Sequence, residues 1–159
     1  MGSIAAIATA ALIVHALSAV VWVGGMFFAL IALRPATARL LEAEPRLELW
    51  GGVLGRFFAW IFAAIVLLLA SGYAMILVVF GGFRAIGLHI QIMQGIGIMM
   101  MLLFLHVYFA PWRRFRAALA RRDHAAAARQ LTQIRTLVAI NLILGLATIA
   151  VGSSGRYWG

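Results

Sequence analysis

Histidine and methionine are the side chains of this sequence best suited to hold a metal or a cofactor. The chain has no cysteine, which excludes disulfides, thiolate ligands, iron–sulfur clusters and c-type haem attachment. It also has no lysine, which excludes Schiff-base catalysis. A carboxylate-based transporter or proton pump is not expected, because the four acidic residues lie outside the apolar segments. The histidines are His15, His89, His106 and His124.

Two of the histidines, His15 and His89, are predicted to lie at one depth in a membrane. His15 lies 19 residues before Arg34, which corresponds to about 28 Å of helix. His89 lies 22 residues before Pro111, or about 33 Å, so both belong to an outer layer once helix tilt is allowed for. The other polar side chains expected in this layer are Ser71, Tyr73 and Gln91.

Two imidazoles facing each other across a helical bundle can fill both axial positions of a b-type haem. The first hypothesis is therefore a bis-histidine haem b protein that transfers electrons near the outer membrane face. Arg84 and Arg156 are the only cations expected on that face, and they would hold the haem propionates. A quinone near Trp22 or Tyr73 is a candidate electron partner. If the chain is an enzyme, this hypothesis makes it a membrane oxidoreductase.

Copper is the alternative to haem as the group bound by this outer layer. Imidazole suits copper and thioether suits Cu(I), so His15, His89 and Met93 could form a copper site. A third hypothesis makes the chain a structural or assembly subunit whose histidines only pack. An inner layer, with His106 near Asn141, is either a second site or a polar contact between helices.

Two stripes of side chains at helical spacing contain the candidate ligands. Such stripes are more often plain packing than the wall of a cofactor site. A pair of glycines, Gly24 and Gly25, would let another helix or a flat cofactor approach the first stripe closely. The stripes are His15, Ala19, Trp22 and Met26, and His89, Met93, Ile96 and Met100.

The composition indicates that the helices carrying these stripes are surrounded by lipid and not by water. Hydrophobic residues make up 65% of the 159-residue chain, charged residues only 11%, and the mean hydropathy is +1.06. Apolar surface on this scale cannot be buried inside so small a globule. We expect an all-α integral membrane four-helix bundle that forms a single domain over residues 1–159. The predicted spans are residues 4–33, 57–80, 88–110 and 136–152.

Helix-breaking residues set the predicted ends of the spans. Arg34–Pro35 should end the first span and Pro111 should follow the third. Pro45 can open the second helix, and Gly81–Gly82 separates the second from the third. Asp123 is placed to cap the helix that leads into the fourth span.

Arginine predicts the orientation in the membrane, because positive residues stay on the cytoplasmic side. All arginines except Arg84 and Arg156 fall in or next to the first and third loops. Both termini should therefore face outward, away from the cytoplasm. The first segment lacks a basic region before it, so it is expected to be a retained span. The net charge of +9 then anchors loops to anionic lipid, and no nucleic-acid partner is expected.

Short segments along the chain together carry a family resemblance. They are His15–Phe28, Leu33–Pro35, Ser71–Tyr73, Gly87–His89, Leu105–Arg114, Gln133–Arg135, Ile140–Leu142 and Gly155–Tyr157. With them the sequence resembles the short four-helix bacterial membrane proteins of the copper-resistance protein CopD family, over nearly the whole chain. This resemblance implies copper handling in the bacterial inner membrane, with the termini in the periplasm. A fainter resemblance is to the HemJ-type protoporphyrinogen oxidases, which implies haem binding by His15, although Gln91 stands where their third-helix motif has lysine.

Partners other than the lipid bilayer follow from these hypotheses. A haem or copper protein would need a periplasmic redox or copper partner. A homodimer is an open alternative, since Gly51, Gly52 and Gly55 would allow close contact near the inner surface.

Overall fold

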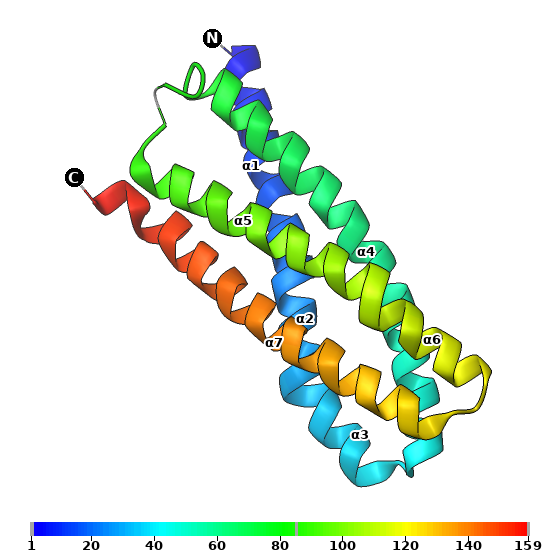
Figure 1. The fold of residues 1–159 in the computed structure, drawn as a ribbon. Coiled ribbons are helices and arrows are strands. Elements are labelled where there is room, and N and C mark those ends of the chain that lie inside the picture. Colours follow the sequence, from blue (N-terminus) through cyan, green and yellow to red (C-terminus); the bar gives the residue numbers. More distant parts are fainter. Residues whose placement is uncertain (1, 85, 159) are drawn as a thin grey trace.

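Four long helices make up most of the described residues in the computed structural model (Figure 1). The structure describes residues 2–84 and 86–158, with the backbone alone for Arg156. Each helix is long and apolar enough to cross a membrane, and the described residues contain no strand. The predicted all-α membrane fold is therefore confirmed.

Short π-helical turns interrupt the first and third helices without ending them. The first helix runs from Gly2 to Leu40, and the second is α4 (Ala43–Val78). The fourth is α7 (His124–Ser154), which is followed by the short 3-10 helix η4 (Gly155–Tyr157). The segments of the first helix are α1 (Gly2–Ala19), η1 (Val20–Gly24), α2 (Gly25–Phe27), η2 (Phe28–Leu33) and α3 (Arg34–Leu40), and those of the third are α5 (Leu88–Val107), η3 (Tyr108–Trp112) and α6 (Arg113–Ala120).

The helices pack as two pairs. The first pair is α1 with α4, and the second is α5 with α7. The pairs meet through η1, α2 and α6, and they diverge toward the end of the molecule that carries both termini (Figure 1). A side chain of α1 near its N-terminal end therefore meets α4 rather than α5 or α7.

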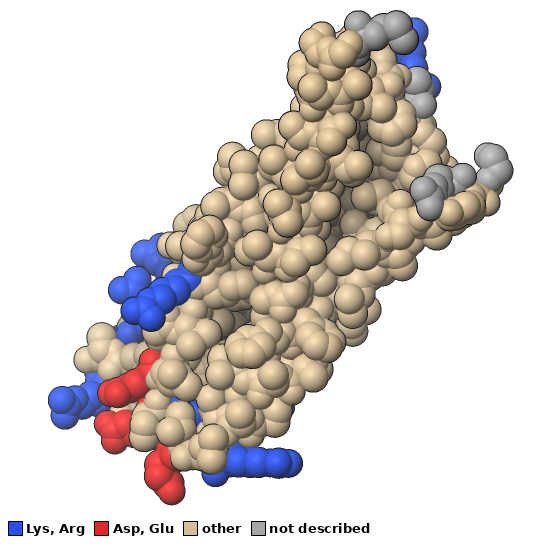
Figure 2. Space-filling view, turned by 180° about the vertical axis from the view of Figure 1, so that it is seen from behind, with Lys and Arg blue, Asp and Glu red and all other residues tan. Residues whose placement is uncertain are grey.

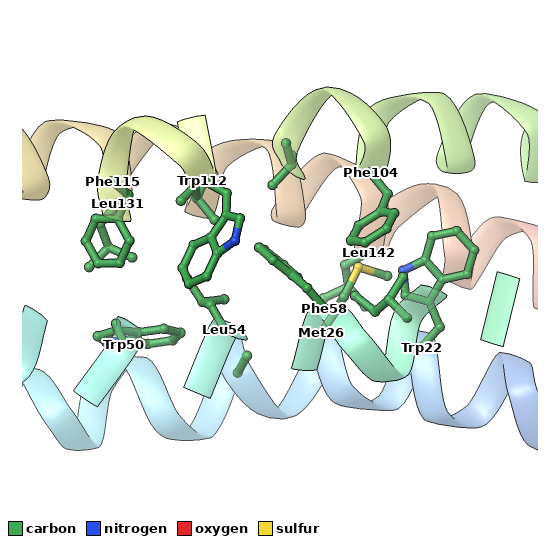
Figure 3. Packing of buried hydrophobic residues seen from close by; sticks show 14 of the residues in the cluster. Trp22, Met26, Trp50, Leu54, Phe58, Phe104, Trp112, Phe115, Leu131 and Leu142 are labelled. Atoms are coloured by element: carbon green, nitrogen blue, oxygen red, sulfur yellow. The ribbon is translucent and has the colours of Figure 1, made fainter. Parts of the chain in front are cut away.

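The hydrophobic core lies where the two pairs meet. Its aromatic rings pack edge to face: the Phe58 ring centroid is 5.5 Å from that of Phe104 and 5.2 Å from that of Trp112 (Figure 3). Of the described residues of α1 only Ser18 is buried, so this helix adds little to the core. The largest fully buried side chains are Trp50, Phe58, Phe115, Met26, Ile61, Ile134 and Pro111.

Two predicted helix ends are wrong. The first helix continues through Pro35 to Leu40, and the third continues through Pro111 to Ala120. In both helices a π-turn precedes or contains the proline, and its wider hydrogen-bonding pattern accommodates a residue without an N–H group. The second and fourth helices also begin before their predicted spans, at Ala43 and His124.

The other predicted boundaries are confirmed. Gly81 and Gly82 have φ angles of 70° and 118°, a region that favours glycine, and they separate α4 from α5. Pro45 lies in the first turn of α4. The Asp123 side chain accepts a hydrogen bond of 2.9 Å from the Ala126 N–H and so caps α7.

Charge is concentrated at one end of the molecule (Figure 2). We call this the arginine-rich end: it holds the turn between α3 and α4 and the turn between α6 and α7. The opposite end, called the terminal end here, holds both termini and the loop between α4 and α5. Its arginines are Arg84 and Arg156. Which end faces the cytoplasm stays a prediction.

Candidate functional site

His15 is held against α4 by a hydrogen bond. Its Nδ1 atom lies 3.0 Å from Ser71 Oγ, and its ring packs on Gly72, where an added Cβ would lie 3.3 Å from Cε1. The Ser71 hydroxyl donates its single hydrogen to the Leu67 carbonyl, at 2.5 Å, so it accepts from His15. The network thus assigns the proton of the neutral ring to Nδ1 and leaves the lone pair of Nε2 for a ligand.

His89 lies in the other helix pair, against the C-terminal segment. Its ring packs so closely on Gly155 that a methyl group there would overlap it. The ring centroid is also 6.4 Å from that of Trp158, edge to face. The side chain is half-buried, and the absence of a side chain at Gly155 makes room for it.

The stripe of side chains on α5 packs against glycines of α7. A Cβ at Gly152 would lie 2.9 Å from Met93 Sδ, and one at Gly145 would lie 3.1 Å from Met100 Cε. Met93 and Met100 therefore face α7, and His89 faces Gly155 of η4, which directly follows α7. The stripe was predicted, but its glycine partners were not; their spacing of seven residues, two helical turns apart, is the signal that could have revealed them.

The two candidate histidines have different neighbours. Among the described residues, no contact or hydrogen bond joins the rings of His15 and His89: His15 contacts α4, and His89 contacts η4 and Trp158. Bis-histidine ligation needs both rings to face one haem. This arrangement lends the haem b hypothesis no support. Within residues 2–84 and 86–158, no group of three or more His, Asp or Glu side chains is placed to hold a metal.

The remaining outer-layer candidates make local contacts. Tyr73 Oη accepts a hydrogen bond of 3.1 Å from Gln94 Nε2, which links α4 to α5; Gln94 was not predicted. Gln91 Nε2 donates to the Ile86 carbonyl at 3.4 Å, near the start of α5. Arg84 is exposed in the loop between α4 and α5, and the side chain of Arg156 lies outside the described part of the chain.

His106 and Asn141 are not brought together. His106 is exposed on the outside of the bundle, whereas Asn141 is buried and its Oδ1 has no hydrogen-bond partner. Asn141 instead lines a small cavity, about 10 Å³, together with Trp22 and Met26. Trp22 packs on Phe104, with ring centroids 6.2 Å apart, and lies in the core instead of beside His15 (Figure 3).

Comparison with known proteins identifies the family. A family model described as copper resistance protein D (CopD) matches residues 51–154. The chain belongs to the CopD family. The matched residues run from α4 through α7, so His89 and Met93 fall inside the match while His15 and Trp22 precede it. Searches of curated proteins and of solved structures found no match. The fainter likeness to HemJ-type oxidases stays a prediction.

Proposed function

We propose that this CopD-family protein binds Cu(I) in the bacterial inner membrane and takes part in copper transfer. The family description, copper resistance, supports copper as the cargo. The chain has no cysteine, so imidazole and thioether are the ligands it can offer to a soft ion within the membrane. The copper alternative thus has more support than haem.

The position of His89 and Met93 is the observation that carries the proposal. The two residues are four positions apart, which places them one above the other on one helix face, roughly 6 Å apart along the axis. His89 packs on Gly155 of η4 and Met93 packs on Gly152 of α7, so neither meets an opposing side chain at these two positions. One Cu(I) ion can therefore take a nitrogen ligand from His89 and a sulfur ligand from Met93.

His15 supplies a further donor on the other helix pair. Its Nδ1–H bonds to Ser71, an arrangement that fixes ring orientation as outer partners of metal-binding histidines do. We assign its Nε2 atom, through the free lone pair, as the ligand of a second copper position. This position exchanges the ion with the one at His89 and Met93.

Anaerobic Cu(I) titration of the purified protein against a chromophoric chelator tests the proposal. We expect stoichiometric copper, and at least about tenfold weaker binding in both His89→Ala and Met93→Leu. His106→Ala and Met99→Leu are matched controls, because these exposed side chains lie on the same helix, and they should bind as the wild type does. Unchanged affinity in both site variants would refute the site. A Soret band with stoichiometric porphyrin and no copper would restore the haem hypothesis.

A further inference from the structure

An open groove lies on the outside of the third helix, where η3 passes into α6. It has a volume of about 550 Å³. Aromatic side chains form the part of the groove nearer α5, and two arginines form the part on α6. The residues that line it are Tyr108, Phe109, Trp112, Arg113, Arg116 and Ala117.

The two arginines of this groove have no acidic partner in the part of the chain that the structure describes. The ion pair found among the described residues joins His124 to Glu44, and no carboxylate or hydrogen-bond acceptor contacts Arg113 or Arg116. The Arg116 guanidinium lies 6.0 Å from the centre of the Trp112 ring, a cation–π contact that restrains it. Because Arg113 and Arg116 are three residues apart on a helix, they are neighbours on its surface. The groove therefore presents two adjacent positive charges to a ligand.

The groove joins an apolar surface to a charged one. Phe109 is 59% exposed and continues the apolar surface of the membrane-spanning α5, whereas Arg113 begins α6 at the arginine-rich end. A ligand seated here has one part in hydrocarbon and one part at the membrane surface. A phospholipid has this construction.

We propose that the groove binds one anionic phospholipid, with its phosphate on Arg113 and Arg116 and its acyl chains along Phe109 and Tyr108. Guanidinium groups bind phosphate through paired hydrogen bonds, which favours arginine over other cations for this role. Two unpaired positive charges favour a lipid with net negative charge, because a choline headgroup would add a third positive charge. This site is independent of copper binding.

Native mass spectrometry of the delipidated protein tests this site. The probes are phosphatidylglycerol, phosphatidylcholine with the same acyl chains, and inorganic phosphate. We expect one retained phosphatidylglycerol per chain, and at least about tenfold less retention in the variant R113Q/R116Q. The matched control R121Q/R122Q removes the same charge near the end of the same helix, outside the groove, and should retain the lipid. Circular dichroism and gel filtration verify that each variant is folded.

Each other outcome overturns the proposal. Equal retention of phosphatidylcholine would mean that the groove binds acyl chains whatever the charge of the headgroup. Equal retention of inorganic phosphate would mean that the arginines bind a free anion. An equal loss in R121Q/R122Q would mean that surface charge in general, and not this groove, holds the lipid.

Discussion

Gly24 and Gly25 are adjacent in sequence but differ in their surroundings. A Cβ added at Gly25 would overlap the Phe57 ring of α4, whereas a Cβ at Gly24 would meet no atom within 4 Å. The close approach that the glycine pair predicts is therefore confirmed, but only at Gly25, where the Phe57 ring of α4 packs. A flat cofactor is not needed to explain it.

Alanine at these two positions separates the roles of the glycines. We expect Gly25→Ala to destabilise the protein by about 1–3 kcal/mol, because the Phe57 ring must shift in a packed interface. Gly24→Ala should be neutral or stabilising by up to about 1 kcal/mol, because alanine is the better helix former and the space is free. Thermal unfolding in detergent measures both. Equal unfolding temperatures for the two variants would contradict the assigned packing.

The sequence predicts which residues are candidate ligands better than it predicts which residues surround them. The sequence identifies His89 and Met93 as one stripe, and the structure places both on the α7 side of α5. Pairing His15 with His89 rested on depth alone, and depth does not determine which helices are adjacent. That information lies in long-range packing, here the pairing of α1 with α4 and of α5 with α7.

At the scale of elements, hydropathy located all four helices, but two of their predicted ends are wrong. Long apolar runs can only be helices in lipid, so their existence is well determined by composition. Pro35 and Pro111 predict helix ends, because a proline lacks an N–H and usually breaks a helix, but both helices continue past them. The π-turn η3 lies in the packed core, where Pro111 and Trp112 are both buried, and such packing is not visible in the local sequence.

The start of α7 depends on its cap. Replacing Asp123 by alanine should cost about 1 kcal/mol of stability, because the Ala126 N–H loses its acceptor at a helix end. Asp123→Asn should retain most of that stability, since asparagine caps about as well as aspartate. Thermal unfolding of the three proteins under one detergent condition makes the comparison. If asparagine behaved as alanine does, the charge of Asp123 and not its cap would be what stabilises α7.

At the scale of the whole molecule, the distribution of charge predicts how the bundle is oriented in the membrane. All arginines but Arg84 and Arg156 lie in or next to the turns at the arginine-rich end or in the helical turns leading to them. The positive-inside rule predicts that this end lies in the cytoplasm, because the two loops there are short enough to be governed by that rule. The acidic residues lie at the same end (Figure 2) and do not reverse this result, since they contribute little to orientation.

Cysteine labelling tests the orientation directly, because the chain has no cysteine of its own and each introduced thiol is unique. Phe83→Cys lies in the exposed loop between α4 and α5, and Ala125→Cys lies in the first turn of α7 at the arginine-rich end. In intact spheroplasts, a membrane-impermeant maleimide should label only the cysteine at position 83. Permeabilisation should then expose the cysteine at position 125. The reverse pattern would place both termini in the cytoplasm and move His89 and Met93 to the inner face, where a copper site would receive its ion from a cytoplasmic donor.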